Sequence, residues 1–571
     1  MDRVIPGILH LHTYFFFPFS IDKAAVLEEH GAVWASRQHW IDGLDDWLAE
    51  HQKAPALKAL GGWRRAAYTR FDMESVAYQD MVFFHPFVRR VFFDVSDSSA
   101  QGADALLRCY AMPVPKGKKL WFEAEDRKGR RARVEVTDLR LFLFANGIGI
   151  LSIGVEAFHI SASDALWINE ALRKVYPSSG RQIRESRVPC RFALVVEGRD
   201  YTEILAEERF ETGEMKGFLP PLSKTITSLL YFADYTRQEF EPVLDERMIV
   251  YTYFAIDPAT VLPDYVHSED YQILLSRFLY VDRLGEDYRY NPEFVRRQMA
   301  AQLYTRWAHQ GTYFGCTSYS NITGTIGAFD CDEHLLREGF LIHRMFDTRY
   351  YLMSLVALFY RATLLMFAER TALVAKRLYM DQEDGNLSLE NLRLANDLAT
   401  EFLHFSNYWH FEELANKDEE IEHFELQCRE YRIASMRAEV EQEIEKMNAS
   451  LNNYYQFHSN EAVNRLAVVS LVMGAGAVLT GFFGMNFGRA FGEWVFSPER
   501  VSPALHYSLL IAVTLLAFGG LLFGTWVIAS HWQDYRDTLR RSSKRPRIGG
   551  APRHVLDELD SAVAERTAPR D

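Results

Sequence analysis

The tripeptide Gly484-Met485-Asn486 contains the side chain whose chemical role is easiest to infer. It lies at the end of an uncharged apolar run, residues 466–488, and a second uncharged run covers residues 501–533. Each run has the roughly 20 residues that a helix needs to cross the hydrocarbon core of a bilayer. An amide at the mouth of such a two-helix hairpin is a candidate ion ligand, because it could face a water-filled path in an otherwise dry environment.

A stripe of small residues lies on one helical face of the first run, with successive spacings of 4, 3, 4 and 3 residues. Small residues let helices approach closely in lipid, and they could equally face a pore. The two interpretations are compatible, although the spacing alone favours helix packing. The members of the stripe are Ser470, Gly474, Ala477, Gly481 and Gly484.

Two helices cannot enclose a pore alone, so a conducting hairpin requires several copies around a symmetry axis. One Asn486 per chain would then form a ring of neutral amides. Such a ring suits Mg²⁺, because this ion sheds its first-shell waters reluctantly. Amide carbonyls can accept hydrogen bonds from the hydrated ion without trapping it.

Eight acidic side chains gather between residues 411 and 430, against two basic ones. They form either a solvated helix face or a surface that attracts or senses cations near a pore entrance. The candidate sensing residues are Glu412, Glu413, Asp418, Glu419, Glu422 and Glu425, and the other two acids are Glu420 and Glu430.

Cysteine and histidine provide no complete metal site in the sequence. The five cysteines are scattered without a CxxC pair, which indicates reduced thiols in a cytosolic region. Cys331 and His334 could begin a metal site, but no second half accompanies them. With no catalytic constellation and no motif for an organic cofactor, we predict no enzymatic activity. We interpret the dispersed N-terminal histidines as structural or surface residues: His10, His12, His39, His51 and His85.

The 571 residues are too many for one compact core, so several structural units are expected. A mean hydropathy of −0.17 indicates that most of the chain is soluble and that only the hairpin is embedded in the membrane. The net charge of −14 argues against general nucleic-acid binding and favours cation attraction.

Residues 1–340 alternate between strand-like and helix-like patterns, which predicts the α+β or α/β class. Strands are predicted at residues 4–21, 81–95, 191–197 and 248–256, and a hairpin at residues 139–155 around Asn146-Gly147. Helices are predicted at residues 162–175 and 223–239. Residues 312–327 are rich in Gly, Thr and Ser but lack a Walker-type Lys, so they are not interpreted as a phosphate loop.

Strand signals end near residue 340. Residues 349–370 are apolar, but Arg361 divides them, so a buried helix is favoured over a third membrane span. A turn is predicted at Asp384-Gly385-Asn386. Residues 387–466 contain neither Pro nor Gly, which predicts two or three long helices, the last running directly into the membrane.

Flanking basic residues predict the orientation of the hairpin. Six Arg and Lys residues follow the second run between positions 536 and 547, whereas the loop has two Arg residues offset by two Glu residues. The positive-inside rule therefore assigns the tail to the cytosol. Two spans return the chain to the same side, so the N-terminal region, which has no recognisable secretory signal, is expected to be cytosolic too. The basic tail could also contact anionic lipid headgroups.

The segment from Asn460-Glu461 through the apolar run to Gly484-Met485-Asn486-Phe487 resembles the CorA family of magnesium channels. The resemblance implies a cytosolic α/β domain, a stalk helix, two spans and a homopentamer in a bilayer, here a bacterial inner membrane. It implies a metal site at Gly484, Met485 and Asn486, with Asn486 holding a hydrated ion. The implied pore-lining residues are Val463, Leu466, Ser470, Gly474, Ala477 and Gly481.

The resemblance also divides the chain. Residues 1–340 would form the cytosolic domain and residues 341–465 the helical region with the stalk. The first span would be residues 466–488, the outer loop 489–503, the second span 504–530 and the basic tail 531–571. The chain departs from the family at Asn464, where many members have Lys, and at Ala475, where Pro is common.

The leading hypothesis is transport of a divalent cation, with Mg²⁺ first. A related branch moves Zn²⁺ and typically has Val at the position of Met485, so Met485 favours Mg²⁺, while Zn²⁺, Co²⁺ and Ni²⁺ stay open. A membrane-anchored regulatory protein without transport is the alternative from another class.

Overall fold

The computed structural model describes residues 5–21, 44–49 without 46, 55–67, 82–94, 106–326 with short gaps, 342–484 without 384–386, and scattered positions between 502 and 526. The described residues divide into two compact units, with the boundary after Glu443. The first unit contains the sheet and most of the helices. The second contains the greater part of the last long helix.

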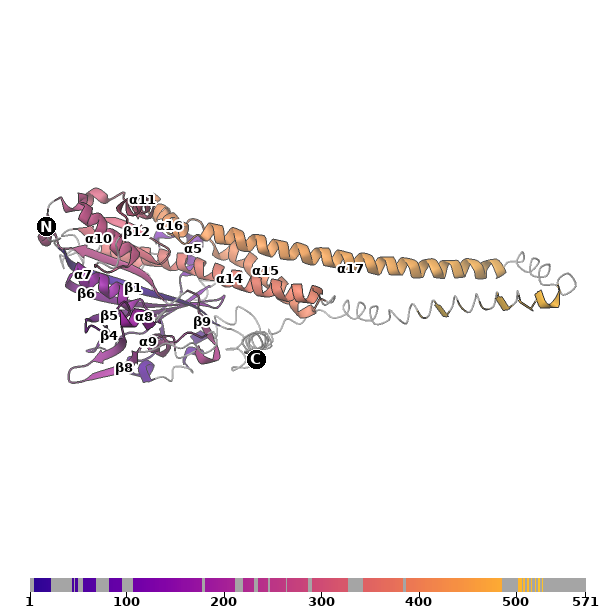
Figure 1. Ribbon diagram of the computed structural model, residues 1–571, viewed down its shortest axis with the longest axis horizontal. Helices are drawn as coiled ribbons and strands as arrows, with labels where there is room; N and C mark the ends of the chain where they lie inside the picture. The colour runs from indigo at the N-terminus through magenta and orange to yellow at the C-terminus, as the bar shows by residue number, and fades with distance from the viewer. Residues whose placement is uncertain are drawn as a thin grey trace. The chain divides into compact units, whose positions relative to one another are not determined.

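A mixed sheet of 13 strands forms the centre of the first unit (Figure 1). Its main path is β11-β12-β13-β10-β1-β6-β5-β4-β7-β8, and β2, β3 and β9 pair at its side. All named pairs are antiparallel except the parallel pair β10–β13. The strands are β1 (Gly7–Ile21), β2 (Arg64–Arg65), β3 (Leu107–Ala111), β4 (Lys119–Glu125), β5 (Arg131–Phe144), β6 (Ile148–Ser161), β7 (Arg191–Glu197), β8 (Thr202–Arg209), β9 (Phe240–Pro242), β10 (Ile249–Ile256), β11 (Leu303–Tyr304), β12 (Tyr313–Cys316) and β13 (Ser320–Ile326).

One set of helices lies among the strands in the sequence, and a second set follows the last strand. The N-terminal ones are α3 (Pro55–Leu60), α5 (Pro86–Phe92), α7 (Ala162–Leu172), α8 (Gly180–Arg184), α9 (Lys224–Leu229), α10 (Glu269–Tyr280) and α11 (Pro292–Gln302), with short 3-10 turns η3 (Tyr235–Arg237), η4 (Pro258–Thr260), η5 (Tyr265–His267) and η6 (Ala308–Gln310). The later ones are α13 (Ile342–Met345), the π-turn η8 (Phe346–Tyr350), α14 (Tyr351–Glu383), α15 (Leu389–His404), the π-turn η9 (Phe405–Trp409), α16 (Asp418–Glu430) and α17 (Ile433–Gly484).

The central strand β1 is buried on both faces, which explains its aromatic sequence. Alternate side chains of a strand point to opposite faces. On one face Thr13 Oγ1 donates to Asn169 Oδ1 of α7 at 2.8 Å. On the other, the ring of Tyr14 contacts that of Tyr351 of α14 edge-on, with centroids 4.7 Å apart. The sheet is therefore the middle layer between α7 and α14.

Most of the predicted strands are confirmed. The structure has β1 within residues 4–21, β7 at residues 191–197, β10 within residues 248–256, and the β5–β6 hairpin around Asn146-Gly147. Gly147 adopts a φ of 93°, which the turn requires. Beyond the loop, β6 approaches the aromatic rings of β1 so closely that an added Cβ at Gly154 would lie 2.7 Å from Tyr14 Cε1.

One prediction in this region is wrong and another is confirmed only in part. The segment 81–95 is not a strand, because Pro86 opens the helix α5 and its fixed φ suits the first helical turn. The helix predicted at residues 223–239 is confined to α9 in the described residues, with the short turn η3 after it. The aromatic and β-branched composition of residues 81–95 led to the strand prediction, whereas Pro86 favours the start of a helix.

The apolar segment 349–370 lies within the helical segment Ile342–Asp381, long and apolar enough to cross a membrane by composition, with 78% of its apolar window buried in the protein. Its central charge is satisfied internally, since Arg361 Nη1 donates to the Ser318 carbonyl. The same guanidinium lies 5.1 Å from the centroid of the Tyr431 ring. The interpretation of this segment as a buried core helix is confirmed.

Three helices, α15, α16 and α17, occupy residues 387–466, as the absence of helix breakers predicted. Asp384-Gly385-Asn386 lies outside the described residues. The longest, α17, runs without interruption for 52 residues. Its early part has a buried apolar stripe at three- and four-residue intervals, formed by Val440, Ile444, Met447 and Leu451.

Candidate ion-conducting segment

The predicted pore face lies on the last turns of α17. All six predicted pore-lining positions are exposed within the single chain, and the side chains of Val463 and Leu466 are 59% and 52% exposed. A Cβ added at Gly474 or Gly481 would meet no atom within 4 Å. The face of small residues therefore has no partner at these glycines among the described residues of its own chain.

The tripeptide begins where the described helix ends. Gly484 is the last residue of α17. Met485 and Asn486 lie outside the described residues, as do the loop 489–500 and the basic tail. The predicted ion ligand at Asn486 stays a prediction.

Apolar side chains near the C-terminus are exposed, unlike those of α14. Leu515, Leu522 and Trp526 are 66%, 66% and 65% exposed, and Met473 on α17 is 63% exposed. Large exposed apolar side chains are unfavourable in water, and such surfaces commonly contact lipid or other protein. This contrast separates the core helix α14 from the segments predicted to span the membrane.

Some of the acids between residues 411 and 430 pair with neighbouring side chains, whereas others only face solvent. Glu419 accepts hydrogen bonds from Trp307 Nε1 at 2.8 Å and Tyr350 Oη at 3.3 Å, and Glu422 accepts from Tyr304 Oη. These hydrogen bonds hold α16 against the chain around β11 and against η8, the segment just before α14.

Two more of the acids are also engaged. Glu420 is buried 3.8 Å from Arg349, and burial raises its pKa. Glu430 accepts from Gln302 Nε2 at 3.0 Å. The exposed members of the set are Glu412, Glu413, Asp418, Glu422 and Glu425, so only part of the predicted sensing surface faces solvent.

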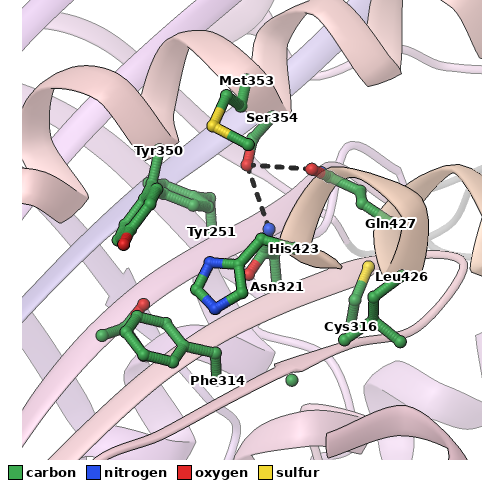
Figure 2. Close-up of a pocket in the computed structure, with 12 residues that line it drawn as sticks. Tyr251, Phe314, Cys316, Asn321, Tyr350, Met353, Ser354, His423, Leu426 and Gln427 are labelled. Carbon is green, nitrogen blue, oxygen red and sulfur yellow. Dashed lines mark hydrogen bonds between the residues drawn. The ribbon is translucent and has the colours of Figure 1, made fainter. Parts of the chain in front are cut away.

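A small cavity lies where α14 and α16 meet β12 and β13 (Figure 2). The His423 ring stands against Phe314, with centroids 4.3 Å apart, and against Tyr350 at 4.9 Å. Burial lowers the pKa of His423 to about 3. Asn321 Nδ2 donates to Ser354 Oγ at 3.0 Å across the cavity. Its volume of about 30 Å³ suits ordered water rather than an organic ligand.

Residues 379–526 match the family described as CorA-like Mg²⁺ transporter protein. The predicted resemblance to the CorA family is confirmed. The CorA-like region begins at the end of α14 and includes α15, α16 and α17, so it is longer than the hairpin and its approach alone. The family consists of membrane-embedded divalent-cation transporters rather than enzymes, and its members generally form homo-oligomers.

Searches of curated proteins and of solved structures gave no significant match. The sheet domain lies outside the CorA-like region, apart from the helices at its end.

The structure also brings together histidines that the sequence separates. His10 and His12 are not dispersed residues, because they lie on one face of β1 beside His343 of α13. The alternation of a strand could have revealed the His10–His12 pair, whereas nothing in the sequence indicated His343. His39, His51, Cys331 and His334 lie outside the described residues.

Proposed function

We propose that this chain transports Mg²⁺ through a homo-oligomeric pore in a membrane, with a ring of Asn486 side chains at the outer mouth. The observation that supports this most strongly is the CorA-like region at residues 379–526. The pentameric number and the bacterial inner membrane come from the resemblance and are part of the proposal.

The geometry of α17 supports a continuous link from the cytosolic domain to the pore mouth. At about 1.5 Å per residue, its 52 residues extend over about 78 Å. The exposed positions Val463 and Leu466 precede the small-residue stripe, and in the proposal they form the narrow cytosolic end of the pore. The tripeptide at the far end of the helix then meets the outer solution.

The direction of transport follows from electrostatics. A membrane potential contributes about 2.3 kcal/mol per elementary charge per 100 mV, so a dication gains about twice that on moving to the negative side. With cytosolic N- and C-termini and an inside-negative potential, Mg²⁺ enters the cell without another energy source.

Cation sensing is proposed for the acids that remain accessible. Glu412, Glu413, Asp418 and Glu425 are exposed, with no hydrogen bond that ties them to a neighbouring helix in the described residues. Loss of Mg²⁺ from these carboxylates would increase their mutual repulsion and loosen contacts between subunits. The engaged acids Glu419, Glu420 and Glu430 serve the packing of α16 instead.

The decisive experiment measures Mg²⁺ entry into proteoliposomes that contain the full chain and an entrapped Mg²⁺ dye, under an inside-negative potential. We expect entry with wild type and a loss of at least 10-fold in Asn486→Ala, because the amide ring is removed. Asn453→Ala is the matched control, since it removes an exposed amide of α17 outside the apolar run.

The other hypotheses correspond to other results of this experiment. Entry of Zn²⁺ or Co²⁺ but not Mg²⁺ would support a transition-metal transporter of the same fold. Silence toward all these ions, in a correctly assembled oligomer, would favour a membrane-anchored regulatory protein. Full Mg²⁺ entry through a folded Asn486→Ala protein would exclude the proposed amide ring.

A further inference from the structure

Three histidines and one glutamate meet between the sheet and the start of the helical region. His10 and His12 are alternate residues of the central strand β1 and therefore face the same side. Glu156 of β6 stands opposite His12 in the antiparallel register. His343 comes from α13, immediately before the π-turn that leads into α14.

The distances suit a common ion. One ligand nitrogen from each of the three histidines lies within 4.8 Å of the others, and His12 Nδ1 is 2.9 Å from His343 Nε2. Glu156 carboxylate oxygens lie 3.4 Å from His10 Nε2 and 3.7 Å from His12 Nε2. Tetrahedral zinc at about 2.0–2.1 Å from each nitrogen requires ligand atoms about 3.4 Å apart.

Several of these ring nitrogens lack a hydrogen-bond partner although they are buried. His10 and His12 are only 4% and 3% exposed, and in the described part of the chain His10 Nδ1, His10 Nε2 and His12 Nε2 form no hydrogen bond of good geometry, although the two Nε2 atoms lie 3.4 and 3.7 Å from Glu156. Unpaired buried polar atoms are costly, and a coordinated ion would satisfy them. The unsatisfied atoms and the clustered geometry are independent observations, and both indicate a ligand.

A carboxylate lies beside the histidines and supplies a matching charge. Glu156 is 3.4 Å from His10 Nε2 and 3.7 Å from His12 Nε2. One carboxylate and three neutral rings carry a net charge of −1, which a dication overcompensates by one charge.

Aromatic rings flank the cluster. The ring of Phe158 stacks on His10 with centroids 4.4 Å apart, and Phe346 contacts His12 edge-on at 5.6 Å. Beyond His12, Tyr14 donates to Asp347, and burial raises the pKa of that carboxyl to about 6. Arg140 pairs with Asp138 at 2.6 Å on the same side of the sheet.

We propose that His10, His12 and His343 form a binding site for one Zn²⁺ or a similar transition-metal dication, with the Glu156 carboxylate beside it as a partner of the strand histidines. The donor set distinguishes this ion from the proposed cargo, because Mg²⁺ prefers oxygen ligands in octahedral geometry. The site lies outside the CorA-like region and does not depend on the proposed transport function. Occupancy would join β1 and β6 to the segment that begins α14.

The experiment uses the full-length detergent-solubilised protein after treatment with a chelator. Calorimetric titration with Zn²⁺ is expected to give one equivalent per chain, and Co²⁺ is expected to give the visible absorption of a four-coordinate site. A saturating metal should also raise the melting temperature by about 3 °C at 100 times its dissociation constant. Mg²⁺ at the same concentration should produce neither change.

Variants distinguish the site from adventitious binding. His343→Gln and His12→Gln should each weaken Zn²⁺ binding by at least 100-fold and abolish the Co²⁺ spectrum. His309→Gln, at an exposed position, is the matched control and should behave as wild type. Because His343 is less buried than the strand histidines, its variant remains informative if His12→Gln fails to fold.

Two results would overturn the proposal. One is the absence of stoichiometric Zn²⁺ binding to folded wild type, which would leave a hydrogen-bonded structural cluster. The other is equal Zn²⁺ affinity in wild type and His343→Gln, which would place the metal elsewhere. Asn486→Ala should retain full Zn²⁺ binding, so a failure of transport and a failure of this site are separable.

Discussion

At the scale of single residues, Gly149 shows how closely two strands approach. An added Cβ there would overlap the ring of Phe19, which is fully buried. We expect Gly149→Ala to destabilise the protein by about 1–3 kcal/mol, the usual cost of overpacking. Denaturant unfolding of the full chain, followed by tryptophan fluorescence, measures the loss.

The matched glycine control is Gly180→Ala. A Cβ there approaches only the guanidinium end of Arg184, which can move away at little cost. Its effect should stay within about 0.5 kcal/mol. If the two variants unfold at the same denaturant concentration, the close packing of β6 on β1 does not limit stability.

At the scale of elements, the docking of α16 depends on a neutral histidine. Burial lowers the pKa of His423 from 6.5 to about 3, so in acid the unfolded chain binds a proton that the folded chain does not. Stability is complete above pH 6.5 and decreases as the pH falls below it. Between pH 7 and pH 5 this group alone should cost about 2 kcal/mol, at 1.36 kcal/mol per pH unit.

His423→Phe isolates that contribution. The ring still packs against Phe314 and Tyr350, but it no longer titrates. The difference in unfolding free energy between wild type and variant, measured from pH 7 to pH 5, should change by about 2 kcal/mol. His309→Gln, at an exposed position, should keep the wild-type dependence. Parallel pH profiles for wild type and His423→Phe would contradict a neutral buried His423.

Helices and strands could be predicted from the sequence where the pattern of apolar residues and the turn-forming or charged residues favour the same structure. Alternation and Asn146-Gly147 indicated the β5–β6 hairpin, and Arg361 in an apolar helix indicated burial rather than a span. The segment 81–95 failed because a helix start at Pro86 overrode strand propensity. Which acids near α16 are engaged could not be predicted, because Trp307 and Tyr350 reach Glu419 only through tertiary packing.

The same limit applies to the candidate sites. Gly484-Met485-Asn486 was recognisable because its chemistry is local: a short motif next to an apolar run. The histidine cluster joins β1 to α13 across more than 300 positions, and only the tertiary fold brings these two segments together. A single sequence contains no signal for such a distant pairing beyond the alternation of His10 and His12.

At the scale of the whole molecule, the small-residue stripe of α17 can be assigned to packing or to pore lining by experiment. A side chain at Gly474 would meet nothing within 4 Å among the described residues of its own chain, so a loss of assembly or of transport in Gly474→Leu would indicate a contact with a neighbouring helix or a narrowed path. We expect loss of the oligomer if the stripe packs between helices. We expect an intact oligomer with Mg²⁺ entry reduced at least 10-fold if the stripe lines the pore.

Light scattering of the detergent-solubilised protein measures the first effect, and dye-reported Mg²⁺ entry into proteoliposomes measures the second. Gly476→Leu adds the same bulk at an exposed glycine of α17 that is not part of the stripe, so it controls for a general effect on the helix. Wild-type assembly together with wild-type entry in Gly474→Leu would show that this face meets neither another subunit nor the ion. A leucine side chain would disturb a tight helix contact or narrow a pore. The glycine would then face lipid, and the pore would have to be built from another face of α17.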